Sequence, residues 1–291
     1  TPAQVEQLRQ EMGLDRPPTE QFLRYLGGLL RGDMGRSIAS RQPVLEDLRV
    51  FFPATLELVV LAFFLMVAIG IPVGILSSIN QGKLSDYLTR IPVIAGTGIP
   101  IFWLALMGQL VFYYMLGWFP FGGRLDRLSV APPTVTGFYS IDSLLNGDIP
   151  LFFETIRHLF MPAMALAIGR AAIITRLTRA SMLEVLNQDF IRTAHSKGLH
   201  PFYIINRHAL KVSFIPVLTE LGMQLGWLLA GTVVVESIFA WPGIGRYAFT
   251  AIQYHDLSAI MGVTLVLAFF KVMFNLVVDI SYAFLDPRIT Y

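Results

Sequence analysis

Long apolar runs dominate the pattern of this chain and set its expected architecture. A helix rises about 1.5 Å per residue, so roughly 20 apolar residues cross the hydrocarbon core of a bilayer. Each run therefore predicts a membrane-spanning helix, and the chain is expected to be an all-α integral membrane protein. Prolines inside such helices are tolerated when neighbouring groups satisfy the freed carbonyl. The runs cover residues 55–79, 91–116, 159–177, 213–239 and 257–285.

Composition supports a membrane protein and narrows its chemistry. Hydrophobic residues make up 54% of the 291 residues and charged residues only 14%, whereas a soluble domain carries about 25% charged residues. The absence of cysteine excludes disulfides and thiolate metal sites. A formal charge of +2 is too small to indicate a nucleic-acid partner.

Lysine and arginine in the short loops predict the orientation. The 80–90 loop and the 183–212 loop are both basic and fall on the same side of a five-span chain, and basic loops mark the cytoplasmic side. Residues 117–158, 240–256 and 1–50 are then external. An external amino terminus before five spans predicts a further, missing first span, giving six in the full protein. A reversed topology is the alternative, and the two basic loops argue against it.

The first 50 residues are predicted to be a periplasmic amphipathic segment, followed by a transmembrane domain over residues 51–291. Apolar residues at three and four spacing predict short helices over 5–14 and 18–32. Gly13 and Gly32 are expected to end them. This segment is interpreted as a lid or packing element on the outer face.

The stretch 181–216 is polar, basic and patterned like short helices, and it interrupts two spans. Such a loop is typical of a subunit that exchanges force with a soluble partner. Gly198 is expected to break the chain between two short helices, because glycine accepts positive φ. Thr193 and Ala194 are small enough for close approach, while Arg192 and Lys197 can pair with carboxylates of a partner. The alternative is an ordinary basic loop held by lipid head groups.

Catalytic motifs are absent from the sequence. It contains no G-x-x-x-x-G-K-[ST], no H-E-x-x-H and no G-x-S-x-G. A transport subunit without its own ATPase site is therefore expected, with the energy source on another chain. The histidines are scattered, and the five-residue spacing of His195 and His200 is poor for one helix face. No metal site is expected.

Ionisable residues within the apolar runs are candidates for function, because an unpaired charge in the membrane is costly. Glu236 lies near the outer end of its run and is expected to snorkel to the surface, whereas Glu220 lies nearer the inner half. Lys271, Asn275 and Asp279 are spaced four apart and form one polar stripe. Contact between helices is favoured over a substrate site for this stripe.

The outer segment WPGIGR at 241–246 predicts a tight turn after the fourth run. Pro242, Gly243 and Gly245 favour the turn, and Trp241 is typical of the aromatic belt at a membrane interface. The segment is interpreted either as a turn anchored by tryptophan or as an outer gate element. Both interpretations are compatible with the residue types.

Several of these segments resemble the permease subunits of bacterial ATP-binding-cassette importers, in the dipeptide, oligopeptide and nickel branch. The family's cytoplasmic motif resembles DFIRTAHSKGL at 189–199, although Arg192 stands where the wider family usually has Glu and the closing proline is displaced to Pro216. The resemblance covers nearly the whole chain. Further matches are ESIFAWPGIGR at 236–246, FPATLEL at 52–58, TRASMLEVL at 178–186 and DPRI at 286–289.

The resemblance implies a multi-pass permease of the bacterial inner membrane that pairs with a second permease subunit as a heterodimer. Two ATPase subunits would hold ATP and magnesium, and a periplasmic binding protein would deliver substrate; no cofactor is expected in this chain. Peptides are the family's commonest cargo, with nickel chelates and glutathione as alternatives. The implied coupling residues are Arg192, Thr193, Ala194, Lys197, Gly198 and Leu199, and the implied gate residues are Glu236, Trp241, Pro242, Gly243, Gly245 and Arg246.

The competing class is a channel or secondary transporter that works alone. It would be expected to show a paired network of charges in the membrane or an inverted repeat, and the sequence shows neither. A membrane-embedded hydrolase is disfavoured by the missing motifs.

Overall fold

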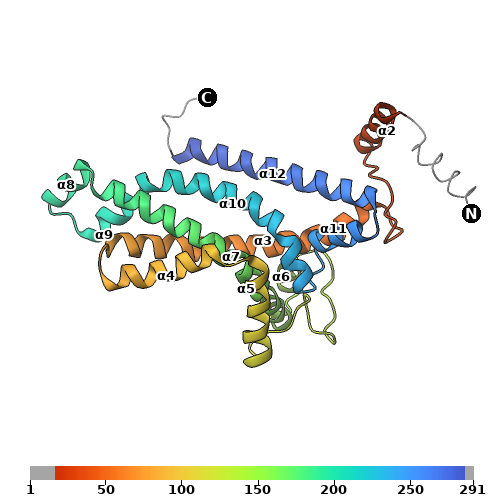
Figure 1. The fold of residues 1–291 in the computed structure, drawn as a ribbon, viewed down its shortest axis with the longest axis horizontal. Helices are drawn as coiled ribbons and strands as arrows, with labels where there is room; N and C mark the ends of the chain where they lie inside the picture. The colour runs from red at the N-terminus through yellow and green to blue at the C-terminus, as the bar shows by residue number, and fades with distance from the viewer. Residues whose placement is uncertain (1–16, 286–291) are drawn as a thin grey trace, which may run out of the picture.

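The protein is described by a computed structural model over residues 17–285, without the side chains of residues 90, 94, 278–279 and 281–285. Every regular element in this range is helical, which confirms the predicted fold class (Figure 1). The elements are α2 (Pro18–Leu30), α3 (Val44–Ile79), α4 (Leu84–Gly98), α5 (Ile101–Gly108), η1 (Gln109–Met115), α6 (Tyr139–Leu145), α7 (Ile149–Leu186), α8 (Asp189–Ser196), α9 (Pro201–Tyr203), η2 (Ile204–Ala209), α10 (Leu210–Ile238), α11 (Ile244–Gln253) and α12 (Leu257–Leu285).

Four continuous helical stretches within the described residues are long and apolar enough to cross a bilayer. Each overlaps one of the predicted runs, but three begin well before the run does, at Val44, Ile149 and Pro201. The extra turns are polar enough to be missed by hydropathy and are helical because they pack against the rest of the chain. The four stretches are Val44–Ile79, Ile149–Leu186, Pro201–Ile238 and Leu257–Val277.

The prediction of one continuous spanning helix over 91–116 is wrong, because this run forms two helices with a sharp bend between them. Helix α4 and the α5–η1 helix meet at 109°, so this run crosses as a broken span or re-enters (Figure 1). Pro100 has no N–H to continue α4, and a residue that precedes proline is pushed away from helical angles. Ile99 is accordingly extended, with φ −87° and ψ 126°.

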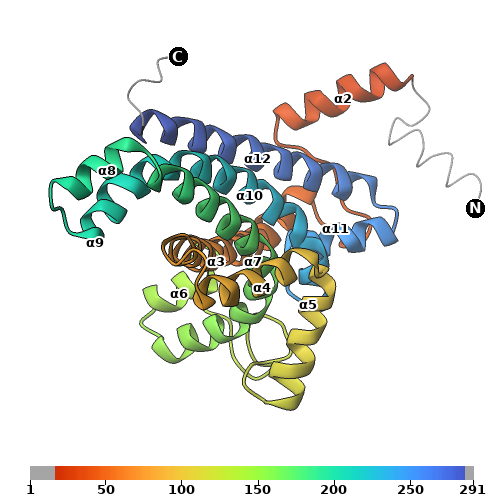
Figure 2. The same cartoon turned by 60° about the vertical axis from the view of Figure 1, so that its left-hand side comes forward.

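Helices α3 and α7 pack closely along most of their length at the centre of the bundle (Figure 2). Small residues make this approach possible. A Cβ on Gly70 would lie 2.8 Å from Ile174, and one on Gly74 would lie 2.6 Å from Thr178. Helices α10 and α12 lie side by side and cover one flank of this pair.

Helix α2 confirms the predicted second short helix, and Gly32 ends it with a φ of 80°. The predicted helix over 5–14 lies outside the described residues. None of the side chains of α2 is buried, and Phe22, Leu23 and Leu30 are exposed. A packing role for α2 would therefore need a surface outside the described residues.

Asp256 ties the segment that follows α2 to the start of α12. Its buried carboxylate accepts hydrogen bonds from Ser37 Oγ (2.6 Å) and from the backbone N–H groups of Ile38 (2.6 Å), Ala39 (3.2 Å) and Ala259 (3.1 Å). Burial acts to raise the pKa of Asp256, but these donors stabilise the charged form and hold the pKa below its ordinary value.

We expect the Asp256 carboxylate to make the free energy of unfolding depend on pH in the acidic range. Because the folded pKa lies below the unfolded one, the stabilisation is complete above the ordinary aspartate pKa of about 3.9 and is lost as the pH falls through the folded pKa. Asp256→Asn should remove this dependence and cost about 2 kcal/mol at neutral pH, since hydrogen bonds to a charged group are lost. Thermal unfolding of the detergent-purified protein between pH 3 and 7 measures both effects. Asp189→Asn is the control, because that side chain is 95% exposed; an equal loss in both variants would contradict the assignment.

Candidate functional site

The predicted coupling segment, residues 183–212, forms one end of the molecule, where α8 and α9 project beyond the long helices (Figure 1). Gly198 lies between these two short helices with a φ of 73°, which confirms the predicted break. A Cβ there would meet no atom within 4 Å. The positive φ, and not crowding within this chain, is what calls for glycine.

Helix α8 is seated on the chain by its apolar face. Ile191 and Ala194 are buried in a cluster that joins the end of α7 to η2, with Met182, Val185, Ile204 and Ala209. The expectation that Ala194 allows close approach of a partner is therefore corrected: its methyl group faces this protein's own core. Small size at that position lets α8 lie against η2 and the end of α7 within this cluster.

The opposite face of α8 is open. Arg192, Thr193, Lys197, Gly198 and Leu199 are all exposed. Arg192 Nη1 lies 3.4 Å from Asp189 Oδ1, with side chains 75% and 95% exposed. Such a pair contributes little to stability, so the guanidinium remains available. The exposed set matches five of the six predicted coupling residues.

Glu236 is the centre of the outer turn at the opposite end of α10. It is fully buried, so the expectation that it snorkels to the surface is wrong. Its carboxylate accepts hydrogen bonds from Thr55 Oγ1 at 2.7 Å and from the backbone N–H of Arg246 at 2.9 Å. These donors replace water and hold the charge-bearing group inside the protein.

Gly243 and Gly245 are needed because a side chain would not fit at these positions, and not because their backbone angles require glycine. A Cβ on Gly243 would collide with the Glu236 carboxylate, and one on Gly245 would lie 2.7 Å from Val233 Cα. Thr55 also accepts from the N–H of Ile244 at 2.8 Å. The turn is thus fitted directly onto α3 and α10.

Trp241 is fully buried, and its Nε1 donates to the carbonyl of Ala54 at 2.9 Å. The predicted place in the interface belt is corrected, because this hydrogen bond and the surrounding core hold the indole inside the protein. Arg246 is exposed and donates from Nη1 to the carbonyl of Ala240 at 2.9 Å. Pro242 and Arg246 border a cavity of ≈ 520 Å³ that Asp47, Phe51, Tyr247 and Tyr254 also line.

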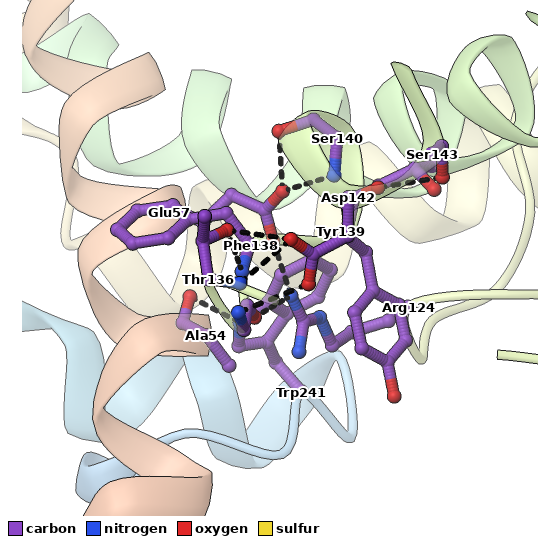
Figure 3. A network of polar contacts seen from close by, with 12 residues as sticks. Ala54, Glu57, Arg124, Thr136, Phe138, Tyr139, Ser140, Asp142, Ser143 and Trp241 are labelled. Carbon is purple, nitrogen blue, oxygen red and sulfur yellow. Dashed lines mark hydrogen bonds and ion pairs between the residues drawn. The ribbon is translucent and has the colours of Figure 1, made fainter. Parts of the chain in front are cut away.

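A buried ion pair that the sequence did not reveal stands beside this turn (Figure 3). Arg124 Nη2 lies 2.5 Å from Glu57 Oε2, with side chains only 7% and 3% exposed. The other Glu57 oxygen accepts from the N–H and Oγ of Ser140, at 2.7 and 2.6 Å. The Arg124 guanidinium stacks over Tyr139, 3.4 Å from the ring centroid. The lone Glu57 in the first apolar run was the available clue.

The polar stripe on α12 faces α10 at Lys271, whose side-chain carbons lie beside Gly226. Lys271 and Asn275 are exposed and line a cavity of ≈ 400 Å³ together with Trp227. The side chain of Asp279 lies outside the described residues. The guanidinium of Arg170 lies over the ring of Trp227, with Cζ 5.1 Å from the ring centroid. Further contacts that cover Lys271 and Asn275 would have to come from outside the described residues.

Glu220 is half-buried on α10 and accepts a hydrogen bond from Gln224 Nε2, one turn further along the same helix. The structure therefore separates the predicted residues into three places. The coupling face lies at one end, the outer turn at the other, and the polar groups of α10 and α12 between them.

The fold is that of the membrane subunit of an ATP-binding-cassette importer. The methionine transporter MetNI in an inward-facing conformation matches with a TM-score of 0.60 at 15% identity, over 80% of this chain and 93% of that one. An amino acid transporter solved with histidines matches with a TM-score of 0.54 at 14% identity, over 79% and 90%. At these identities the likeness concerns the fold alone.

The family follows from the sequence comparisons. The model of the binding-protein-dependent transport system inner membrane component matches residues 70–291. The probable D,D-dipeptide transport system permease protein DdpB of Escherichia coli (strain K12) is 48% identical over 98% of this chain and 84% of its own length. The di/tripeptide transport system permease protein DppB of Pseudomonas aeruginosa (strain UCBPP-PA14) is 41% identical over 96% and 83%.

This chain belongs to the family of binding-protein-dependent transport system inner membrane components. It is a multi-pass permease of the inner membrane and a transport subunit, not an enzyme. By family, the ATPase sites lie on separate subunits, and the permease works with ATPase and binding-protein partners.

We expect Gly245→Ala to destabilise the outer turn. The new methyl group would lie 2.7 Å from Val233 Cα, which is backbone and cannot turn aside. Overpacking of this kind costs about 1–3 kcal/mol. Thermal unfolding of the purified protein measures the loss. Gly108→Ala is the control, because a Cβ at Gly108 meets no atom within 4 Å; equal melting temperatures for the two variants would contradict the close fit.

Proposed function

We propose that this permease and a second permease subunit form a path for short peptides, powered by two ATPase subunits that bind the inner face, with α8 as the docking element of this chain. The similarity to dipeptide permeases along nearly the whole chain is the observation that carries the substrate class. The open polar face of α8 supports the place where the ATPase binds. ATP and magnesium would be held by those subunits.

The coupling segment is built to transmit movement. The buried cluster under α8 contains residues of α7, α8 and η2, and η2 continues directly into α10. A partner that moves α8 therefore moves the ends of α7 and α10 with it. At about 1.5 Å per residue the 38 residues of α7 reach roughly 55 Å, from this end to the outer loops.

At the outer end, the WPGIGR turn supports a role as a gate element. Its backbone is held by Glu236 and Thr55, so the turn moves only if α3 and α10 separate. The cavity of ≈ 520 Å³ beside it is large enough for a small side chain. We infer that a binding protein delivers peptide to this face.

The function is tested with the reconstituted importer in proteoliposomes. ATP-driven uptake of a labelled dipeptide is expected, with no competition from glutathione or a nickel chelate. Gly198→Trp should abolish uptake and co-purification of the ATPase, because the indole fills the open space where the partner docks. Gly198→Ala is the matched control: it carries the same backbone strain at φ 73° with only one methyl group.

Uptake in Gly198→Ala should stay within about threefold of the unaltered chain, as expected for αL strain alone, which costs roughly 1 kcal/mol. Equal uptake in both variants would exclude docking at this surface. Uptake of glutathione or a nickel chelate in place of the dipeptide would contradict the peptide assignment while leaving the coupling test intact.

We also predict the orientation: residue 128 is periplasmic and residue 196 cytoplasmic. The chain has no cysteine, so single cysteines can be introduced without background labelling. Leu128→Cys is suitable because that side chain is 98% exposed, and Ser196→Cys lies on exposed α8. An impermeant thiol reagent applied to intact spheroplasts should label the first variant only. Labelling of Ser196→Cys alone would reverse the topology.

A further inference from the structure

Three metal-ligating side chains converge at the end of α7 that lies furthest from the coupling segment. Glu154 and His158 are one turn apart on α7, and Asp126 reaches them from the loop that follows η1. One donor atom from each residue lies within 4.8 Å of the other two. The three side chains border an open cavity of ≈ 370 Å³.

Backbone carbonyls fix the orientation of the His158 ring. Its Nδ1 lies 3.1 Å from the carbonyl of Gly122 and 3.2 Å from that of Gly123. Carbonyls only accept hydrogen bonds, so Nδ1 carries the proton in the neutral ring. His158 Nε2 then presents a lone pair to Asp126 Oδ1, another acceptor, at 3.2 Å. Two acceptors in contact require a cation between them, which is either a second proton or a metal ion.

We propose that Asp126, Glu154 and His158 bind a divalent transition metal of the zinc class. Zinc bonds of about 2.0–2.1 Å in tetrahedral geometry place two ligand atoms roughly 3.3 Å apart, which matches the 3.2 Å between His158 Nε2 and Asp126 Oδ1. Two carboxylates balance the charge of the ion. A backbone carbonyl on the far nitrogen is the usual support of a metal-binding histidine.

The surroundings leave the carboxylates available for an ion. Glu154 accepts hydrogen bonds from the N–H of Asp126 at 2.8 Å and from Ser129 Oγ at 2.9 Å, which orient its oxygens and leave further lone pairs. Arg157 borders the same cavity, but its guanidinium is directed elsewhere. It donates to the carbonyl of Trp118 from Nε at 3.0 Å and from Nη2 at 2.8 Å. No Lys or Arg among the described residues forms an ion pair with Asp126 or Glu154.

A bound ion would fasten the loop after η1 to α7. The same loop is already fixed to α10, because Gly123 donates its N–H to the carbonyl of Phe239 at 2.8 Å. It is also fixed to α3 through the Arg124–Glu57 pair. The ion would therefore complete a cross-link among three long helices at the predicted outer face, where a solvent-facing cavity lets it exchange.

Zinc binding by the purified permease, prepared without a polyhistidine tag and stripped with chelator, tests the site. Titration with zinc chloride against a chromophoric chelator should give one ion per chain. Asp126→Asn should weaken binding at least tenfold and leave the fold intact, because that side chain is 69% exposed. His158→Gln should also weaken zinc binding at least tenfold. Glu46→Gln, an exposed carboxylate elsewhere, is the control and should bind like the unaltered chain.

A second readout is independent of stoichiometry. Because zinc would bind only the folded chain, it should raise the melting temperature of the unaltered protein and of Glu46→Gln but not of Asp126→Asn. Equal zinc affinity in Asp126→Asn and the unaltered chain would overturn the proposal. So would the absence of binding at micromolar zinc, which would assign the contact to a doubly protonated imidazole paired with Asp126.

Discussion

The buried carboxylate of Glu236 is the interaction on which the outer end of this permease depends. Three helices meet at it: α3 through Thr55, the end of α10 that carries Glu236, and the start of α11 through the backbone N–H of Arg246. A buried carboxylate without donors would cost several kcal/mol, so the turn must keep its N–H groups aimed inward. That requirement explains why Gly243 and Gly245 have no room for a side chain. The geometry of the turn is therefore a consequence of burying one acid.

The two ends of the helix bundle are held together by different kinds of contact. The outer loops are held by buried acids, with Glu57 and Asp256 acting on other segments as Glu236 acts on the turn. The coupling end is held by apolar contact, since Ile191 and Ala194 pack into a core shared with α7. Apolar packing has no directional donors, so α8 can tilt with α7 as a unit. The outer turn, bound by directional hydrogen bonds, is expected to hold its shape or release it completely.

The sequence predicted the helical class, four of the spans and the break at Gly198, because hydropathy and glycine conformation are local properties. It failed where the outcome depends on which distant groups converge. Glu236 was expected to reach the surface because nothing in its run shows that Thr55 and a turn amide point at it. Trp241 matched an interface residue by type, yet its N–H finds Ala54 in the core. The bend before α5 was visible locally as Pro100, and hydropathy alone concealed it.

The uncovered stripe on α12 bears on how the subunit works. Lys271 and Asn275 lie on a span yet are exposed, in a groove with Trp227. A lysine near the centre of a lipid-facing helix costs about 2.5–3.5 kcal/mol by insertion scales, so this face is a poor match for lipid. An aqueous path or a second polar subunit removes that cost. Arg170 stacks on the same tryptophan, which places two cations beside one groove. The electrostatic interaction of Arg170 with Glu220 already offsets part of this positive charge, so the lysine is the group that most requires polar surroundings.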